Sequence, residues 1–276
     1  MAATSRHMLG RTPYYVLTGG LAIIFLFPIL WAAVASVSPQ AATGQTVGMG
    51  LGNYTTLFHF GVGLPRFLFN SAFVAFLVVA ITLVVSGLGG YAFARFNFPG
   101  RDVLFLVTLA ILMVPYATVL IPLYVMLRVV GLQNSLIGVS LVLVVFQLPF
   151  ATYMMRISFE AVPRELDESA VMDGCGTLSV LWRILIPSVR PGLITVSLFA
   201  FLAAWNDFFA PLILLNDPTQ QTLPLAIANL RQQTMGAIDY GATEAGVVVM
   251  ALPCMVLFLF LQRHFVRGFM SGAVKG

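Results

Sequence analysis

Charged side chains are scarce in this sequence. Lysine, arginine, aspartate and glutamate together form 9% of its 276 residues, whereas an ordinary soluble domain carries about 25%. Hydrophobic residues form 59% of the chain, and its mean hydropathy is +0.96. A soluble globule does not hide so large an apolar fraction from water. The composition therefore predicts a membrane protein with several spans.

Lysine is almost missing. The one lysine is Lys275, and Gly276 follows it. The phosphate-binding loop of an ATPase needs a lysine followed by serine or threonine, in the pattern G-x-x-x-x-G-K-[ST]. The chain has no such loop, so we expect any ATPase that works with it to be another polypeptide.

Histidine and cysteine are also rare. The three histidines, His7, His59 and His264, are widely separated, and none belongs to an H-E-x-x-H pattern. Cys175 lies in a polar stretch and Cys254 in an apolar one. These positions predict neither a metal site nor a disulfide. We therefore expect no enzymatic activity and no cofactor in this chain.

Apolar runs dominate what is present. Six of them are long enough for the roughly 20 residues that cross the hydrocarbon core as a helix. They cover residues 14–37, 64–94, 102–127, 135–155, 191–215 and 243–265. The chain is thus predicted to be a single all-α domain, 1–276, with six transmembrane helices. The first run exceeds the apolar core of a signal peptide, about 7–15 residues, so cleavage after Ala33-Val34-Ala35 is not expected.

Glycine and proline mark special places in two of the runs. Gly87, Gly89 and Gly90 near the end of the second run allow another helix to approach closely. Pro115 and Pro122 interrupt the third run. They indicate either a kink that serves packing or a contact with a transported substrate.

Basic residues predict the orientation. With six spans both termini lie on one side, and eleven of the fourteen cations fall there: Arg6, Arg11, Arg95, Arg101, Arg156, Arg164, Arg183, Arg190, Arg263, Arg267 and Lys275. The opposite side holds Arg66, Arg128 and Arg231. The positive-inside rule then makes the termini and the loop 157–190 cytoplasmic. Because the net charge of +4 sits at span ends, it does not indicate nucleic-acid binding.

The longest charged interval runs from Pro163 to Pro191. Pro163 suits the first turn of a helix, and Glu165, Asp167 and Glu168 would place negative charge at the positive end of its dipole. Gly174 would end that helix. The interval therefore predicts a short acidic helix and a glycine elbow.

A second, amphipathic helix is predicted after the elbow. Thr177 is suited to cap it, and Pro187 to stop it. Leu178, Leu181, Trp182 and Leu185 follow the i, i+3, i+4, i+7 spacing of one helical face. A rigid loop of this kind can transmit displacement from a soluble partner, although an ordinary loop with an interfacial helix fits the pattern too.

A second polar group lies within the fifth run. Asn206 and Asp207 are roughly 22–24 Å along the span from Pro191, hence in its outer half, and Trp205 precedes them. A carboxylate at membrane depth faces a cavity or a partner by default. We assign these three residues and Gln147 of the fourth run to a substrate pathway, with packing against a partner as the alternative.

The charged interval also resembles a known motif. Glu168-Ser169-Ala170, then Asp173-Gly174, then Pro187 thirteen residues later, resemble the EAA loop of the membrane subunits of binding-protein-dependent ABC importers. Ser169 and Cys175 stand where that family usually has alanine. Both side chains are small, so a close fit of this loop against a partner is still expected.

Other stretches are similar to the smaller permease of maltose-type carbohydrate importers. They are residues 53–58 (NYTTLF), 69–71 (FNS), 91–101 (YAFARFNFPGR), 121–124 (IPLY), 148–150 (LPF), 205–208 (WNDF) and 272–276 (GAVKG). Their order along six spans makes the resemblance specific for the family, although it does not name the sugar.

The resemblance implies a type I ABC importer permease of the bacterial inner membrane. It implies a second permease as heterodimer partner, two ATPase subunits that bind ATP and Mg²⁺, and an extracytoplasmic substrate-binding protein. The residues expected to couple to the ATPase are Glu165, Glu168, Ser169, Ala170, Asp173, Gly174, Cys175 and Gly176. The tail from Gly272 to Gly276 is either a further ATPase contact or a frayed end.

Two rival functions remain at this point. A permease for glycerol-3-phosphate or a glycerophosphodiester is disfavoured, because an anionic substrate favours cations in the cavity and no span interior offers one. An ion-coupled secondary transporter would need coupling sites in mid-membrane, and Asp207 alone is slight support for one.

Overall fold

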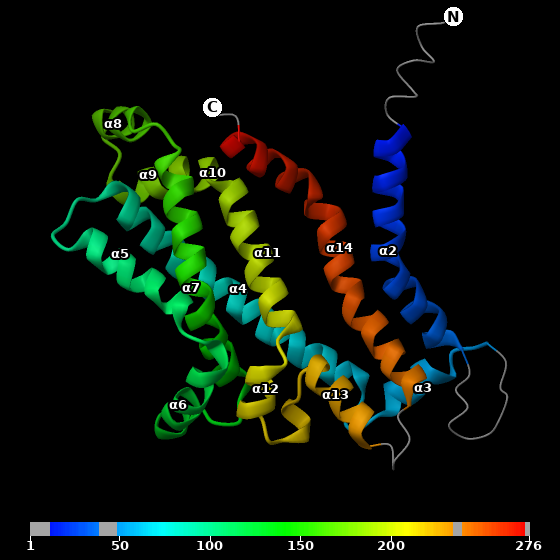
Figure 1. Cartoon of the computed structure of the whole chain (residues 1–276). Coiled ribbons are helices and arrows are strands. Elements are labelled where there is room, and N and C mark those ends of the chain that lie inside the picture. The colour runs from blue at the N-terminus through cyan, green and yellow to red at the C-terminus, as the bar shows by residue number, and fades with distance from the viewer. Residues whose placement is uncertain (1–11, 39–48, 234–238, 274–276) are drawn as a thin grey trace, which may run out of the picture. The chain divides into compact units, whose positions relative to one another are not determined.

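The structure is a computed structural model, and it describes residues 12–38, 49–233 and 239–273. Within these ranges nearly every residue is helical and no strand occurs, which confirms the all-α prediction (Figure 1). The chain divides into two units, Met1–Gly63 with Ile227–Leu252, and Leu64–Ala226 with Pro253–Gly276. The terminal residues Arg6, Arg11, Lys275 and Gly276 lie outside the described residues.

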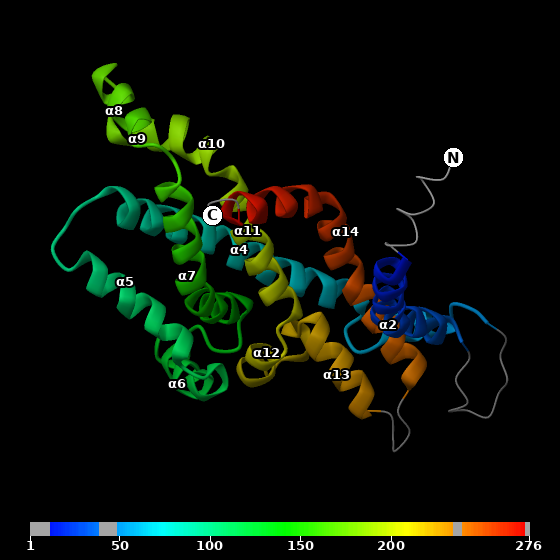
Figure 2. The same cartoon turned by 45° about the horizontal axis from the view of Figure 1, so that its top comes forward.

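Three long helices build the second unit. They are α4 (Leu64–Arg95), α7 (Leu136–Glu160) and α11 (Arg190–Asn206), and each packs against the other two (Figures 1 and 2). At Gly90 the helices α4 and α7 are so close that a Cβ atom would lie 2.5 Å from Cβ of Met155 and 2.8 Å from the backbone nitrogen of Arg156. This contact confirms that a glycine near the end of the second span permits close helix packing.

The third predicted span is broken rather than kinked. It consists of α5 (Arg101–Ala110), a 3₁₀ turn, η2 (Ile111–Met113), and α6 (Tyr116–Val129), with a bend of 105° between Met113 and Tyr116. Pro115 has an extended backbone, ψ 122°, directly before α6. Val114 before it is extended as well, ψ 125°, because a proline disfavours the helical conformation of the preceding residue, so the break falls at Val114 and Pro115. Pro122 lies inside α6.

The fifth predicted span, 191–215, is shorter than expected. Helix α11 ends at Asn206, Asp207 has an extended backbone, and a separate helix α12 follows (Phe209–Leu214). A carboxylate oxygen of Asp207 accepts a hydrogen bond from the backbone N–H of Ala210, 2.8 Å away. Because this bond satisfies an amide at the start of α12, the break in the span follows from the side chain of Asp207.

The predicted helix, elbow and second helix are present in the charged interval. Helix α8 (Glu165–Met172) is followed by α9 (Thr177–Val180), a π turn, η3 (Leu181–Leu185), and α10 (Ile186–Ser188). A bend of 75° separates this second helical stretch from α11. Figure 2 shows α8 and α9 projecting at the end of the unit opposite to α6 and α12.

Three local predictions in this interval were wrong. Thr177 is the first residue of α9 and makes no capping bond, because Gly176 occupies the cap position. Leu178 and Trp182 are exposed whereas Leu181 and Leu185 are buried, so these four residues do not form one apolar face. The helical stretch itself does end beside Pro187, at Ser188. Pro163 precedes α8, which begins at Glu165.

The first unit contains α2 (Thr12–Val37), α3 (Gly52–His59), most of α13 (Leu223–Gln233) and the beginning of α14 (Tyr240–Ala273), as far as Leu252. Asn53 of α3 donates hydrogen bonds to the backbone oxygens of Ser36 and Ser38, 2.9 Å each, at the end of α2. Gly241 lies where a Cβ would collide with the Asn53 amide, so α14 approaches α3 closely as well.

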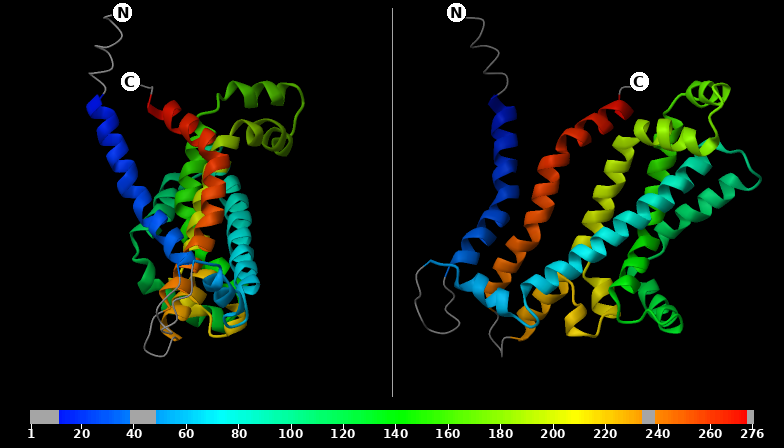
Figure 3. Two further views of the ribbon diagram at one scale, coloured as in Figure 1. Left: turned by 90° about the vertical axis from the view of Figure 1, so that its right-hand side faces the viewer. Right: turned by 180° about the vertical axis from the view of Figure 1, so that it is seen from behind.

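Four helices of the described chain are long and apolar enough to cross a membrane: α2, α4, α7 and α14. The count is six if each bent helix pair forms one span. Figure 3 shows these helices from two further directions. Most large side chains of α2 are exposed in the isolated chain, as expected for a helix that contacts lipid or another subunit.

The contact at Gly90 yields a stability prediction. Gly90→Ala forces the new methyl group into Met155 and Arg156, so we expect destabilisation by about 1–3 kcal/mol, as for other overpacked cores. Gly87→Ala on the same helix is the matched control, because no atom lies within 4 Å of the position of its Cβ. Thermal unfolding of the purified variants in one detergent tests this. Equal midpoints for the two variants would contradict the described packing.

Candidate functional site

Helix α8 has two different faces. Ala170 is 5% exposed and is the one buried residue of the helix. Asp167 precedes it by one turn and is half-buried, whereas Glu165, Glu168 and Met172 are exposed. The inner face thus packs against the membrane helices. The outer face carries both carboxylates and an apolar side chain, as expected of a surface that binds a protein.

The elbow after α8 has a defined backbone. The N–H of Gly174 donates to the carbonyl oxygen of Val171 and the N–H of Cys175 to that of Ala170, 2.9 Å each. This pair of bonds is the Schellman ending of a helix, and it needs the left-handed φ of +82° found at Gly174. Glycine is therefore required here by the turn itself, in addition to any role at a partner surface.

The structure places most of the predicted coupling residues on the surface. Glu165, Glu168, Ser169, Asp173, Gly174 and Gly176 are exposed. Ala170 instead packs inward, and Cys175 is half-buried against the same apolar cluster. The six exposed residues are available to a soluble partner, whereas Ala170 and Cys175 pack the loop against the membrane helices.

An apolar cluster holds the loop to the long helices. Leu181 and Leu185 of the second loop helix are buried with Met155 and Phe159 of α7, and Tyr91 of α4 belongs to the same cluster. Because these side chains come from separate elements and share one core, the loop is attached to α4 and α7 by packing and is not a free tether.

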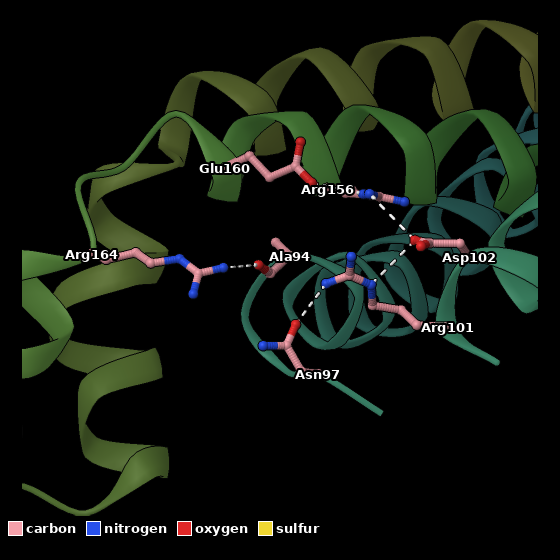
Figure 4. Close-up of polar contacts among 7 residues, drawn as sticks. All are labelled: Ala94, Asn97, Arg101, Asp102, Arg156, Glu160 and Arg164. Carbon is pink, nitrogen blue, oxygen red and sulfur yellow. Dashed lines mark hydrogen bonds and ion pairs between the residues drawn. The ribbon is translucent and has the colours of Figure 1, made fainter. Parts of the chain in front are cut away.

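Two arginine side chains lie beside the N-terminal end of α8. Nε of Arg95 lies 3.2 Å from a carboxylate oxygen of Asp167, and the Arg95 side chain is 6% exposed. Arg164 donates to the backbone oxygen of Ala94 at 3.5 Å (Figure 4). Arg95, Arg164 and Ala94 line one side of a hollow of about 610 Å³ between the end of α4 and the start of α8.

Figure 4 shows further contacts at this place. Arg101 donates to Asn97 at 3.0 Å and to Asp102 at 3.2 Å, both within the turn that joins α4 to α5. Arg156 of α7 donates to Glu160 at 2.8 Å and lies 4.0 Å from Asp102. The motif YAFARFNFPGR, noted in the sequence, thus supplies Arg95, which faces α8, and the next residue, Asp102, faces α7. The sequence did not reveal these pairings.

The polar residues of the fifth span lie in different environments. Trp205 is 4% exposed, and its ring stacks on that of Phe201 with 5.6 Å between centroids. The second oxygen of Asp207 accepts a hydrogen bond of 2.8 Å from the hydroxyl of Tyr116. Trp205 and Asp207 therefore take part in packing within the chain and in holding α12 and α6. These contacts involve no partner, so the pathway and the packing against a partner both stay predictions.

Asn206 is the exposed member of the group. Its amide donates to the backbone oxygen of Leu202 at 2.8 Å and lies 3.8 Å from the sulfur of Cys254, which leaves its carbonyl oxygen available. Gln147 of α7 is half-buried, and within the described residues no hydrogen bond joins it to Asn206 or Asp207.

The sequence reasoning missed two further residues, one in each unit. Tyr116 follows the Pro115 break and reaches Asp207, which only the fold reveals. Glu244 of α14 lies in the first unit, in an apolar hollow of about 580 Å³ lined also by Phe27 and Trp31 of α2. A carboxylate inside an apolar run was the signal that could have identified Glu244.

The loop after α12 is fixed onto the first part of α4. The amide of Asn70 donates to the backbone oxygens of Thr219 and Gln221, at 2.9 and 2.8 Å, and the hydroxyl of Ser71 accepts from the N–H of Leu223. The hydrogen bonds from Thr219 hold the pKa of Asp217 below its usual value. The segment FNS therefore has a structural role in the loop around η4 (Pro218–Gln220).

Comparison with known proteins gives consistent matches. Residues 86–271 match the family described as "Binding-protein-dependent transport system inner membrane component". The diacetylchitobiose uptake system permease protein DasC of Streptomyces coelicolor is 32% identical over 98% of this chain and 99% of its own. The trehalose transport system permease protein SugB of Mycobacterium tuberculosis is 31% identical over 96% of this chain and 98% of its own.

A solved structure shares the fold. It is a chain of a bacterial ABC transporter involved in the import of the acidic polysaccharide alginate, with a TM-score of 0.78, 22% identity, and coverage of 96% of this chain and 99% of that chain. The likeness confirms the predicted importer-permease fold of this chain.

The pairing of Tyr116 with Asp207 yields a prediction for the outer end. Tyr116→Phe removes a hydrogen bond to a carboxylate, so we expect a loss of about 1.5–3 kcal/mol of stability. Tyr124→Phe on the same helix is the control, because the described residues give the Tyr124 hydroxyl no partner. Thermal unfolding compares the two, and a Tyr116→Phe midpoint equal to that of Tyr124→Phe would refute this role of the bond.

Proposed function

Because this chain belongs to the family of binding-protein-dependent transport system inner membrane components, we propose that it forms half of the membrane pathway of an ATP-driven sugar importer. Family membership makes it a multi-pass subunit of a transport system. The partners are a second permease, two ATPase subunits that bind ATP and Mg²⁺, and an extracytoplasmic binding protein.

The outer face of α8 carries this proposal. Glu165, Glu168 and Asp173 offer carboxylate acceptors, and Met172, which is 87% exposed, offers an apolar contact. Charge-assisted hydrogen bonds to such carboxylates are strong, and an arginine of the ATPase suits them. The lack of a Walker loop in this chain places hydrolysis on that partner.

The proposed docking of an ATPase on this face supports one orientation in the membrane. ATP is cytoplasmic, so the loop 157–190 must be cytoplasmic for an ATPase to dock there. The excess of cations on the side of the termini supports this orientation, with both termini in the cytoplasm. Closure of the two ATPase subunits around ATP then displaces α8 and the helices on which it rests.

A neutral sugar suits the chain best as substrate. The names of DasC and SugB refer to uptake of diacetylchitobiose and trehalose, and both are uncharged disaccharides. Sugar hydroxyls need side chains that both donate and accept, and the amides of Asn206 and Gln147 do so. Glycerol-3-phosphate is the rival substrate, but the middles of the spans lack the cations that a phosphate would favour.

Affinity purification from native membranes tests the assembly. We expect an ATPase, a second permease and a binding protein to co-purify and to be identified by mass spectrometry. In proteoliposomes, the complex should take up a neutral di- or oligosaccharide only with ATP, and glycerol-3-phosphate should not compete. Uptake by the isolated chain on an ion gradient, with no ATPase present, would refute the importer.

Gly174→Asp is expected to abolish ATP-driven uptake. It places a side chain at the left-handed position of the elbow and adds charge to the docking face, while the spans remain inserted. Gly176→Asp adds the same charge two residues away, where the backbone is extended, φ −72° and ψ 157°, and should retain more uptake. Uptake is normalised to the amount of permease in the membrane, and normal transport by Gly174→Asp would contradict the docking role.

Asn206→Ala is expected to weaken sugar transport. One lost hydrogen bond of about 1 kcal/mol raises the KM for the sugar several-fold and leaves ATPase docking intact. Ser197→Ala on the same helix is the control, because its hydroxyl bonds to Leu193 within α11. The check is uptake at varied sugar concentration, and an unchanged KM would remove Asn206 from the pathway.

A further inference from the structure

The ion pair between Arg95 and Asp167 connects the last residue of α4 to the first turn of α8. Arg95 is nearly inaccessible to solvent, with 6% exposure of its side chain, and that of Asp167 is 24% exposed. The 3.2 Å contact is an ion pair without hydrogen-bond alignment, and the other carboxylate oxygen of Asp167 is buried with no hydrogen-bond donor among the described residues. Arg95 therefore supplies the compensating charge that the buried carboxylate needs.

Arg95 also holds the segment that leads into α8. Its guanidinium donates a hydrogen bond of 2.8 Å to the backbone oxygen of Val162. One side chain thus binds both the entry of the loop and the helix that follows. Arg164 repeats the link in the opposite direction, through the oxygen of Ala94, but at 3.5 Å this bond is weak.

Empty space lies beside these links. The hollow of about 610 Å³ is lined by Arg95, Arg164, Val162 and Glu165. Ala170 also attaches α8, by packing in the apolar cluster. A helix that borders a hollow can shift into it when a partner pushes on the helix. Such a shift would not be transmitted to the membrane helices. The ion pair opposes this movement.

The helix that Arg95 ends is joined firmly to its neighbour. Gly90 lies one turn before Ala94, where α4 touches the backbone of α7. Because that contact leaves no room for a methyl group, α4 and α7 move together. A displacement of α8 that reaches Arg95 therefore reaches two membrane helices.

We propose that Arg95 is a positioning residue that converts displacement of α8 into movement of α4 and α7. This proposal rests on the proposed docking of an ATPase on α8, and goes beyond it by assigning the connection to one ion pair. Loss of the pair leaves the ATPase docked and active, but separates its movement from that of the spans.

The experiment uses the complete reconstituted transporter with Arg95→Gln and Asp167→Asn, alone and combined. Glu160→Gln is the matched control, because it breaks an ion pair of 2.8 Å that lies within α7 and connects no two elements. We expect sugar transported per ATP hydrolysed to fall about tenfold in both single variants, a size typical of coupling between sites. The double variant should fall no further, and Glu160→Gln should match the wild type.

A distance measurement separates coupling from simple stability. Spin labels are attached to Met172→Cys on α8 and Leu88→Cys on α4, after replacement of Cys175 and Cys254 by alanine. In the parent, ATP binding should leave the distance between α4 and α8 unchanged. In Arg95→Gln, ATP should shift and broaden it.

The outcomes are distinct. Normal transport per ATP with an unchanged distance in Arg95→Gln would overturn the proposal, and so would an equal loss in Glu160→Gln. If Arg95→Gln does not assemble, Arg95→Lys and Asp167→Asn decide, and full coupling in both would overturn it. A wild-type chain that binds no ATPase refutes the proposed function instead.

Discussion

The close contact between α4 and α7 is the interaction on which the rest of the second unit depends. It forms where Gly90 offers no side chain, and it places the end of α4 beside the end of α7. The loop that leaves α7 can then reach back to α4, so that Arg95 meets Asp167. At the other end of α4, Asn70 and Ser71 hold the loop around η4. The packing of α4 on α7 thus positions the polar contacts at both ends of α4.

Placing a charged side chain in hydrocarbon costs free energy, and this cost explains where the charged residues of the chain lie. Among the few charged residues, those of the charged interval are gathered on a compact helix, elbow and helix outside the spans. Its inner face is apolar apart from Asp167, which is paired, and its outer face presents unpaired carboxylates. Such a surface is stable in water and ready for a partner. The family membership of the chain makes it a subunit of a transport system, and the proposed ATPase would be that partner.

Much of the fold could be predicted from the sequence because the determining patterns are local. Apolar runs define the spans, and Gly174 marks the end of α8 through a backbone conformation that other residues rarely adopt. Local patterns reveal less where a distant residue decides the contacts. Asp207 was assigned to a substrate pathway, and only the fold shows that Tyr116 and the amide of Ala210 donate to its two oxygens. The partners of Arg95 were not visible at all, because Asp167 is distant in the sequence and only the fold brings it near.

The most direct test of the account is whether the outer face of α8 touches a nucleotide-hydrolysing subunit in the assembled transporter. A photoreactive crosslinker on Met172→Cys, the most exposed position of that helix, would be activated in native membranes and the adduct identified by mass spectrometry. The account predicts an adduct with the ATPase that changes in yield when ATP is added. An adduct only with lipid or with the extracytoplasmic binding protein would contradict it.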